Sequence, residues 1–279
     1  MHYRLLAGLL LAAAPAAHAQ LNLEAISQDI LHEGLALYQS ERASWVSTDL
    51  LQASGQPLSQ VSGYISYTTG DSVRTLFVGG PAGAPRVVAD YRYPHNSIRA
   101  AFVRRTGPRA LQPREQHLLT IRQQSLADLQ QVPGAELPAD AAFNAVILPK
   151  GSQFWVYILT APIRPGVVLL GNDYLLRYDA AGKLLTSQKL HHRLIALGPA
   201  PAGQVVDASV HTHLPDLSPF ITPTDICTLL LYHDRVPGQR HLVLGKKYVS
   251  IFSLPDARLA IITRRAFDKL RAAKRAAPQ

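Results

Sequence analysis

The sequence predicts an α+β protein, with an N-terminal half of helix plus hairpin followed by a strand-rich half of mixed α/β type. Residues 22–44 place apolar side chains close to helical spacing. Residues 64–78 contain two short β-type runs around a turn, which is typical of a hairpin. Between residues 154 and 263, short apolar runs alternate with turn residues. Hydrophobic residues make up 47% of the chain, enough for a sizeable core.

Local sequence patterns predict the helices and strands of the N-terminal half. A helix is expected over residues 22–44, and strands over residues 64–68 and 73–78 are joined by a four-residue turn that contains a glycine. Residues 87–93 predict a third strand. A second helix is expected over residues 113–131, because proline suits the first position of a helix. Residues 49–57 are turn-like.

The second half begins after a Val-Pro-Gly-Ala segment at residues 132–135. We expect a short helix over residues 140–148 and another over residues 226–232. The expected strands are residues 154–159, 167–170, 174–178, 183–185, 194–197, 204–210, 241–244, 248–252 and 259–263. A glycine in the turn before residue 183 can supply positive φ for a hairpin. No internal repeat is visible.

Residues 1–19 predict a cleaved signal peptide. Arg4 precedes an apolar run from Leu5 to Ala14, Pro15 follows, and Ala17-His18-Ala19 forms an A-x-A cleavage site. The run is shorter than the roughly 20 apolar residues of a permanent membrane helix. We therefore expect a secreted or periplasmic protein with no transmembrane helix after signal cleavage. Its regions would be residues 20–131, 132–265 and 266–279.

Charge and cysteine content limit the partners and the chemistry. The chain has 28 Lys and Arg against 19 Asp and Glu, a net charge of +9. The last region, 266–279, is predicted to be a basic helix and tail. It could attract an anionic surface or an acidic partner, although a solvated helical face is the favoured interpretation. Nucleic acid is not expected, because the charges lack the series of interleaved aromatic residues that single-strand grooves use; Phe267 is the one aromatic residue among them. Cys227 is the only cysteine, and its apolar neighbours indicate a buried side chain.

A candidate metal site lies between residues 211 and 225. The strand 204–210 runs into His211-Thr212-His213, and residues i and i+2 of a strand point to the same face. Asp225 falls in the first turn of the next helix. Two imidazoles and one carboxylate form a sound zinc set that leaves a fourth position for water, which zinc would activate as a nucleophile. Thr222 as N-cap and Asp225 near the helix dipole also fit an ordinary helix start without metal.

The order of strand, His-x-His, loop, Thr-x-x-Asp and helix resembles the JAB/MPN (JAMM) metalloprotease family over about residues 140–265. The resemblance implies zinc ligands at His211, His213 and Asp225, with Thr222 in place of the family's serine that stabilises the oxyanion. It also implies a peptide or protein substrate, cleaved at a peptide or isopeptide bond. Leu214 stands where the family has proline.

The resemblance also implies a glutamate upstream of the histidines that takes a proton from water. No glutamate follows Glu136, which lies in an expected loop, and Glu115 lies further back. Asp173 or Asp207 could substitute. Two functions therefore stay open: a zinc-dependent hydrolase, or a non-catalytic exported binding or structural protein of the same fold.

A second pair of histidines, His191-His192, is a weaker candidate. Adjacent strand residues point to opposite faces, so both cannot easily serve one site. One of them could support the metal site or act as a fourth ligand, but we expect a surface histidine beside Arg193. No nucleophile elbow, phosphate-binding loop or dinucleotide fingerprint occurs in the chain.

Overall fold

The structure is a computed structural model that describes residues 21–276 apart from residue 82 and residues 199–202. The predicted signal peptide at residues 1–19 lies outside the described residues. The α+β class is confirmed, with four helices and several separate sheets in the described part of the chain. None of the described helices has the length and apolar character that a membrane span requires.

The N-terminal elements form an antiparallel sheet between two helices. The helices are α1 (Leu23–Ala53) and α2 (Pro113–Leu129). The strands are β1 (Val61–Thr69), β2 (Ser72–Gly79), β3 (Arg86–Pro94), β4 (Arg104–Thr106) and β5 (Arg109–Ala110). They follow the order β1-β2-β3-β4, with β5 also on β3, and short 3-10 turns flank the sheet at Leu58–Gln60 and Ala100–Phe102. The predicted β1–β2 hairpin and the helix that starts at Pro113 are confirmed.

A second antiparallel sheet has the order β10-β9-β7-β6. Its strands are β6 (Ala141–Lys150), β7 (Gln153–Pro162), β9 (Tyr174–Tyr178) and β10 (Leu184–Lys189). The helix expected over residues 140–148 is therefore wrong. Residues 145–148 are all buried, and their side chains alternate between two separate core clusters. A strand covered on both faces shows no alternation in its sequence, so the pattern could not reveal it.

The remaining strands surround the candidate metal site. β8 (Val168–Gly171) pairs with β11 (Leu194–Leu197). A four-stranded sheet follows the chain order β12 (Ala208–Thr212), β13 (Arg240–Leu244), β14 (Tyr248–Ser253) and β15 (Arg258–Thr263). β12 and β13 are parallel and are connected through α3 (Pro223–Leu231). The strand predicted over residues 204–210 corresponds to β12, which begins and ends later in the sequence and includes His211. The last helix is α4 (Arg264–Ala276).

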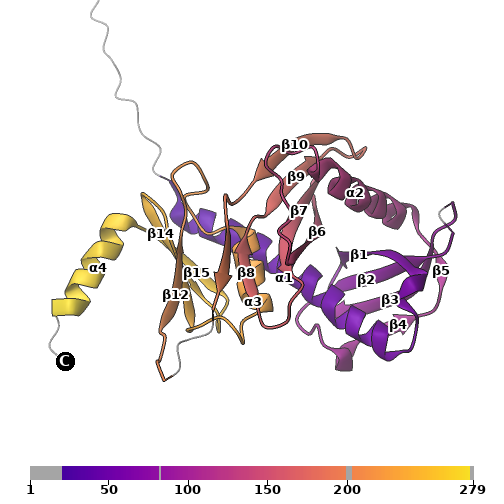
Figure 1. Cartoon of the computed structure of the whole chain (residues 1–279), viewed down its shortest axis with the longest axis horizontal. Coiled ribbons are helices and arrows are strands. Elements are labelled where there is room, and N and C mark those ends of the chain that lie inside the picture. Colours follow the sequence, from indigo (N-terminus) through magenta and orange to yellow (C-terminus); the bar gives the residue numbers. More distant parts are fainter. Residues whose placement is uncertain (1–20, 82, 199–202, 277–279) are drawn as a thin grey trace, which may run out of the picture.

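Helix α1 runs the length of the molecule, from the β12–β15 sheet to the β1–β4 sheet (Figure 1). At 31 residues it extends well past the predicted end at residue 44 and covers part of the segment expected to turn. Where α1 crosses α3, an added Cβ on Gly34 would lie 2.8 Å from the Cβ of Ile226. Only glycine permits this close approach of the two helices, which fixes the position of α3.

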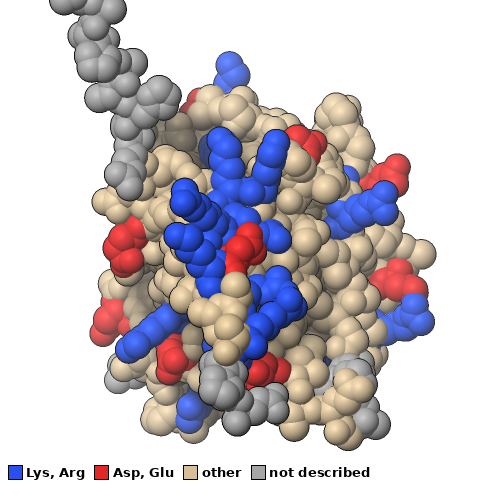
Figure 2. Space-filling view, turned by 90° about the vertical axis from the view of Figure 1, so that its left-hand side faces the viewer, with Lys and Arg blue, Asp and Glu red and all other residues tan. Residues whose placement is uncertain are grey.

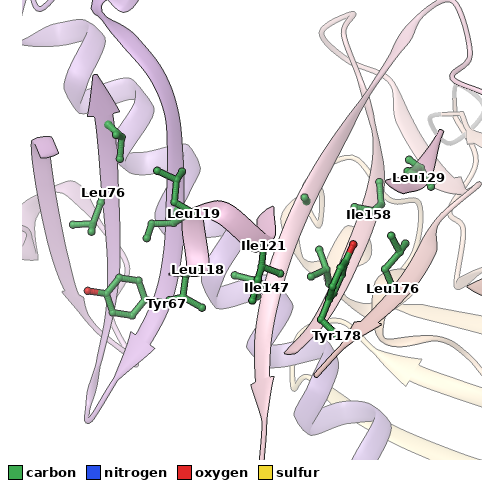
Figure 3. Packing of buried hydrophobic residues seen from close by; sticks show 14 of the residues in the cluster. Tyr67, Leu76, Leu118, Leu119, Ile121, Leu129, Ile147, Ile158, Leu176 and Tyr178 are labelled. Carbon is green, nitrogen blue, oxygen red and sulfur yellow. The ribbon is translucent and has the colours of Figure 1, made fainter. Parts of the chain in front are cut away.

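The largest core cluster lies around α2 (Figure 3). Leu118 and Ile121 of α2 pack between Leu76 of the first sheet and residues such as Ile147 and Tyr178 of the second. This core crosses the boundary predicted at residue 132. The division of the chain into regions stays a prediction.

Candidate metal centre

His211 and His213 extend from the end of β12. His211 pairs in register with Val243 of β13, and the backbone N–H of His213 donates to the Leu244 carbonyl at 3.1 Å, which continues the strand by one residue. Both imidazoles are buried and lie side by side, with ring centroids 4.9 Å apart. The i, i+2 spacing thus places them on one face, as the strand period requires.

Asp225 is held by the start of α3. The backbone N–H and the hydroxyl of Thr222 donate to Asp225 Oδ2 at 2.9 and 2.8 Å, and the Asp225 N–H donates to Thr222 Oγ1 at 3.1 Å. This capping box, followed by Pro223 at the first helical position, is the ordinary helix start that the sequence predicts. It fixes Oδ2 but leaves Oδ1 without a hydrogen-bond partner among the described residues.

The side chains of His211, His213 and Asp225 converge on one point. The two Nε2 atoms are 3.0 Å apart, and they lie 3.9 Å (His211) and 3.7 Å (His213) from Asp225 Oδ2. Ligand atoms about 2.0–2.1 Å from a tetrahedral zinc ion are separated by roughly 3.3–3.4 Å. The observed triangle is close to that size, so a modest adjustment of side chains would allow three metal bonds.

His191 also faces this point, which corrects the expectation of a surface histidine. It is only 5% exposed, and its Nε2 lies 3.3 Å from Asp225 Oδ1. His191, His213 and Asp225 together form a buried group in range to hold a metal ion, with ligand atoms within 4.8 Å of one another. The two histidines lie in the loop between β10 and β11 and not in the strand that the sequence suggests, and His192 is exposed and pairs with Asp216 at the surface.

Long-range contacts bring His191 inside. The Leu190 N–H donates to the Asp173 carbonyl at 2.8 Å, which ties this segment to the turn after β8. Gly171 has φ of +91°, and a Cβ there would lie 2.3 Å from the Arg193 carbonyl oxygen. Glycine is therefore required for the close approach of β8 to the segment that carries His191. No local pattern around residue 191 could have revealed these contacts.

A chain of hydrogen bonds orients the two strand histidines. His213 Nδ1 donates to the Ser218 carbonyl at 3.0 Å, so in the neutral ring its Nε2 presents a lone pair to the site. His211 Nδ1 contacts His241 Nε2 at 2.8 Å, and His241 Nδ1 contacts Ser209 Oγ at 2.7 Å. If His211 donates to His241, and His241 to Ser209, the Nε2 of His211 also presents a lone pair. Metal-binding histidines characteristically use their second nitrogen in this way.

Sequence reasoning missed His241, which is fully buried. In the sequence it begins an ordinary apolar strand, and it reaches the site because β13 is parallel to β12 with Ser209 opposite His241. The signal was therefore not the histidine itself but a strand pairing that connects residues more than 30 positions apart.

The ionisable groups of the site have pKa values shifted in different directions. Burial opposes ionisation of Asp225, yet the facing imidazoles, His191 foremost, hold the pKa of this carboxyl well below its usual value. Burial would also lower the pKa of His191, but Asp225 and then Asp173 raise it to about 10. Burial lowers the pKa of His211 and His213, and lowers that of His241 to about 4. These pKa shifts favour the charged form of His191 and the neutral forms of His211, His213 and His241.

Two buried polar atoms in this cluster lack a hydrogen bond within the described part of the chain: Asp225 Oδ1 and His191 Nδ1. His191 Nδ1 lies 3.5 Å from Asp173 Oδ2 without making a hydrogen bond to it. Buried polar atoms are almost always paired, and exceptions often mark a binding site. The free carboxylate oxygen next to imidazole nitrogens fits a divalent cation that accepts nitrogen and oxygen ligands.

The cluster opens on a cavity of about 330 Å³. His191, His211, His213 and Asp225 line it together with apolar side chains, among them Leu170, Leu194, Ile195, Leu214 and Leu217. A cavity with apolar walls and a few convergent polar groups is typical of a small-ligand or substrate site.

Of the four carboxyls considered as proton acceptors, one lies near the histidine cluster. Asp173 is buried beside His191, with Oδ1 accepting from the Thr160 N–H at 2.9 Å. Asp207 and Glu136 are exposed, and Glu115 is bound by Arg109 in another part of the molecule. Asp173 therefore reaches the cluster only through His191.

Thr222 is 3% exposed and is not among the residues that line the cavity. Its hydroxyl donates to Asp225 Oδ2 and lies 3.4 Å from His191 Nε2, so it contacts two members of the cluster. The catalytic role that the resemblance implies for Thr222 stays a prediction.

Comparison with known proteins adds no family to this description. No protein-family profile matches the chain, and no curated protein matches it significantly.

Proposed function

We propose that this protein is a zinc-dependent hydrolase of JAMM type that acts on peptide or isopeptide bonds outside the cytoplasm. One observation carries the proposal: two imidazole nitrogens and a buried carboxylate lie 3.0–3.9 Å apart beside an apolar cavity. The predicted signal peptide supports a secreted or periplasmic location, and with it a substrate other than intracellular protein conjugates.

In this proposal His211, His213 and Asp225 hold the zinc ion. Thr222 positions Asp225, while Ser218 and His241 orient the two imidazoles. A zinc ion bound there would act as a Lewis acid and lower the pKa of a coordinated water. The three ligands leave a fourth position that can face the cavity, as catalytic zinc sites require.

His191 and the cavity walls supply the remaining parts. We assign to His191, supported by Asp173, the proton transfer that the JAMM family gives to a glutamate. A zinc ion on Asp225 would offset the carboxylate charge that raises the pKa of His191, so that the neutral imidazole could accept a proton from water. Leu194, Ile195 and Leu214 would bind an apolar portion of the substrate and keep bulk water from the reacting bond. The substrate would enter with its scissile carbonyl toward the fourth ligand position.

A second candidate is a non-catalytic exported binding or structural protein with a closed metal site. The 3.3 Å distance from His191 Nε2 to Asp225 Oδ1 favours it, because this separation also suits two ligands of one ion. His191 would then be the fourth ligand, and no position would remain for water.

Zinc analysis tests the site. Purified protein loaded with zinc and freed of excess should retain one ion per chain, and the His213→Ala and Asp225→Asn variants should retain little. His192→Ala is the matched control, since this neighbouring histidine is exposed and outside the cluster. A wild-type protein that retains no zinc would eliminate both candidates.

Activity then separates the two candidates. A hydrolase should cleave members of a mixed peptide and isopeptide library, and cleavage should stop in Asp225→Asn and after treatment with a chelator. His191→Ala should retain zinc and lose cleavage. A closed site instead predicts that His191→Ala loses zinc affinity and changes the visible spectrum of the cobalt-loaded protein. Bound zinc without cleavage in any assay would leave only the second candidate.

A further inference from the structure

Helix α4 stands apart from the rest of the molecule (Figure 1). It has no buried residue, and Leu270 is 63% exposed. Its start is fixed by hydrogen bonds from the Arg264 N–H to the Lys247 carbonyl and from the Ala266 N–H to Thr263 Oγ1. The helix is therefore attached through its first turn, where Arg264, Ala266 and Phe267 are partly buried, and residues 268–276 are exposed and available to a partner.

The helix is strongly amphipathic. The apolar residues Ala266, Phe267, Leu270 and Ala273 form one stripe because residues three and four apart share a face, and Ala272 lies off that stripe. The helix carries six basic residues and one acidic residue, and of these Lys274 lies on the same face as Leu270: Arg264, Arg265, Lys269, Arg271, Lys274, Arg275 and Asp268. The single acidic side chain pairs with Arg264. The charge of the helix therefore exceeds what any internal partner neutralises in the described structure.

The surrounding surface extends this charge. The exposed Lys246 and Lys247 lie in the hairpin that receives the start of α4. On the side of the molecule where α4 lies, Lys and Arg side chains gather near the centre of the view, with most Asp and Glu around them (Figure 2). This basic surface lies on a different part of the chain from the cavity, since no residue of α4 lines the cavity.

We propose that α4 binds an anionic lipid bilayer and lies in its interface, with Phe267 and Leu270 inserted and the basic side chains against the lipid phosphates. An exposed basic helix with a narrow apolar stripe is the typical form of an interfacial membrane-binding helix. Nucleic acid or an acidic protein could satisfy the charges but would leave the exposed Leu270 without a role. Two large apolar side chains give weak insertion, so binding depends on anionic lipid and falls with salt. This inference does not depend on the proposed function.

Vesicle flotation of the whole chain tests the proposal. Phosphatidylcholine vesicles containing phosphatidylglycerol should bind the protein at low salt, and the bound fraction should fall as salt is raised. Pure phosphatidylcholine vesicles measure any binding through the apolar run at residues 5–14, which is subtracted. Absence of extra binding to the anionic vesicles at low salt would overturn the proposal.

Two paired substitutions assign the binding to α4. Lys269→Glu with Arg271→Glu should reduce binding to anionic vesicles at least tenfold, and Phe267→Ser with Leu270→Ser should reduce it severalfold. The matched control reverses two exposed charges elsewhere, Arg86→Glu and Lys183→Glu, and should leave binding nearly unchanged.

The apolar pair decides between lipid and the other partners. If Phe267→Ser with Leu270→Ser binds like the wild type, or if the control pair weakens binding as much as the α4 pair, insertion by α4 is excluded. Tighter binding to RNA or to an acidic polypeptide, with no loss in the apolar variant, would assign the helix to those partners instead. Far-ultraviolet circular dichroism verifies that each variant is folded.

Discussion

Two clusters of this protein bury carboxylates, and they neutralise them in different ways. In the first, which we call the arginine network, Arg109 bonds to Glu115 Oε1 at 2.7 Å and to Asp90 Oδ2 at 3.0 Å, and Arg74 also binds Asp90. Tyr67 donates a further hydrogen bond to Glu115. In the second, Asp225 faces imidazoles and leaves one oxygen unbonded.

The difference separates a structural site from a binding site. Guanidinium groups stay protonated at any pH of interest, so the arginine network is neutralised permanently and joins β2, β3, β5 and α2. Imidazoles can exchange a proton for a metal ion, and their mutual distances in the second cluster leave room for one. Both clusters are buried and charged, and it is the unsatisfied atoms that indicate a ligand.

The largest difference should appear when one carboxylate is neutralised in each cluster. Glu115→Gln should lower the free energy of unfolding by about 3–5 kcal/mol, because Arg74 and Arg109 then face Asp90 as the one remaining carboxylate of the network, which leaves one buried positive charge uncompensated. Asp225→Asn keeps an oxygen acceptor for Thr222, and His191 can lose its proton once the carboxylate charge is gone, so this variant should cost less, about 1–3 kcal/mol. Urea denaturation in the presence of a chelator measures both. Equal losses would show that the two clusters serve the same structural purpose.

Another buried carboxyl, Glu41, provides a pH test. Burial raises its pKa from 4.5 to about 7, only partly offset by Arg122 and by the hydrogen bond from Asn144. The folded state then binds the proton more tightly than the unfolded state. The stabilisation of the folded state by the protonated Glu41 is therefore complete below pH 4.5 and is lost as pH rises through about 7. The free energy of unfolding falls by about 3 kcal/mol in total over this range.

Glu41→Gln keeps an acceptor for Asn144 and should remove that pH dependence. The measurement is the difference in unfolding free energy between wild type and variant at pH 4.5 and pH 8, which cancels the titration of other groups. A difference that is constant with pH would mean that Glu41 ionises in the folded protein as readily as in the unfolded chain.

A smaller effect is expected from His241, which contacts His211 but not the proposed ion position. His241→Phe removes the hydrogen bond to His211 Nδ1 and should weaken zinc binding by roughly 10- to 100-fold without changing the stoichiometry at saturation. Competition with a zinc-selective chelator measures the affinity. Leu242→Val on the same strand is the control, and equal weakening in it would point to strand disruption instead.

The smallest effect is expected at His192. Its ion pair with Asp216 is exposed, so His192→Ala should change the unfolding free energy by less than about 1 kcal/mol and leave zinc content unchanged. Calorimetry and metal analysis measure these values. A loss of zinc comparable to that of His213→Ala would indicate that the metal site includes the exposed pair His192–Asp216.

Local patterns predicted those parts of the fold that local forces determine. Pro113 begins α2, Thr222 and Pro223 begin α3, and the β1–β2 hairpin follows from alternation around a turn. Strand β6 could not be predicted, because its two faces are buried against separate clusters and its sequence lacks alternation. The end of α1 was missed because contacts with distant strands stabilise it beyond residue 44.

The site residues likewise include some that the sequence could predict and some that it could not. His211, His213 and Asp225 share a short segment, and their spacing in the sequence indicated their proximity. His191, Asp173 and His241 join them through strand pairings and a glycine contact that span tens of residues. Sequence spacing can thus suggest a ligand set, while the residues that orient it come from tertiary structure.

The long helix α1 has a consequence for the order of folding. Its first half packs against α3 and β15, which lie about 200 residues later in the chain, so Gly34 can meet Ile226 only after nearly all of the polypeptide is available. Contacts of such long sequence separation slow the search for the native state. We expect refolding to be slow, with α1 acquiring its full protection from hydrogen exchange late, after the β1–β2 hairpin has already formed.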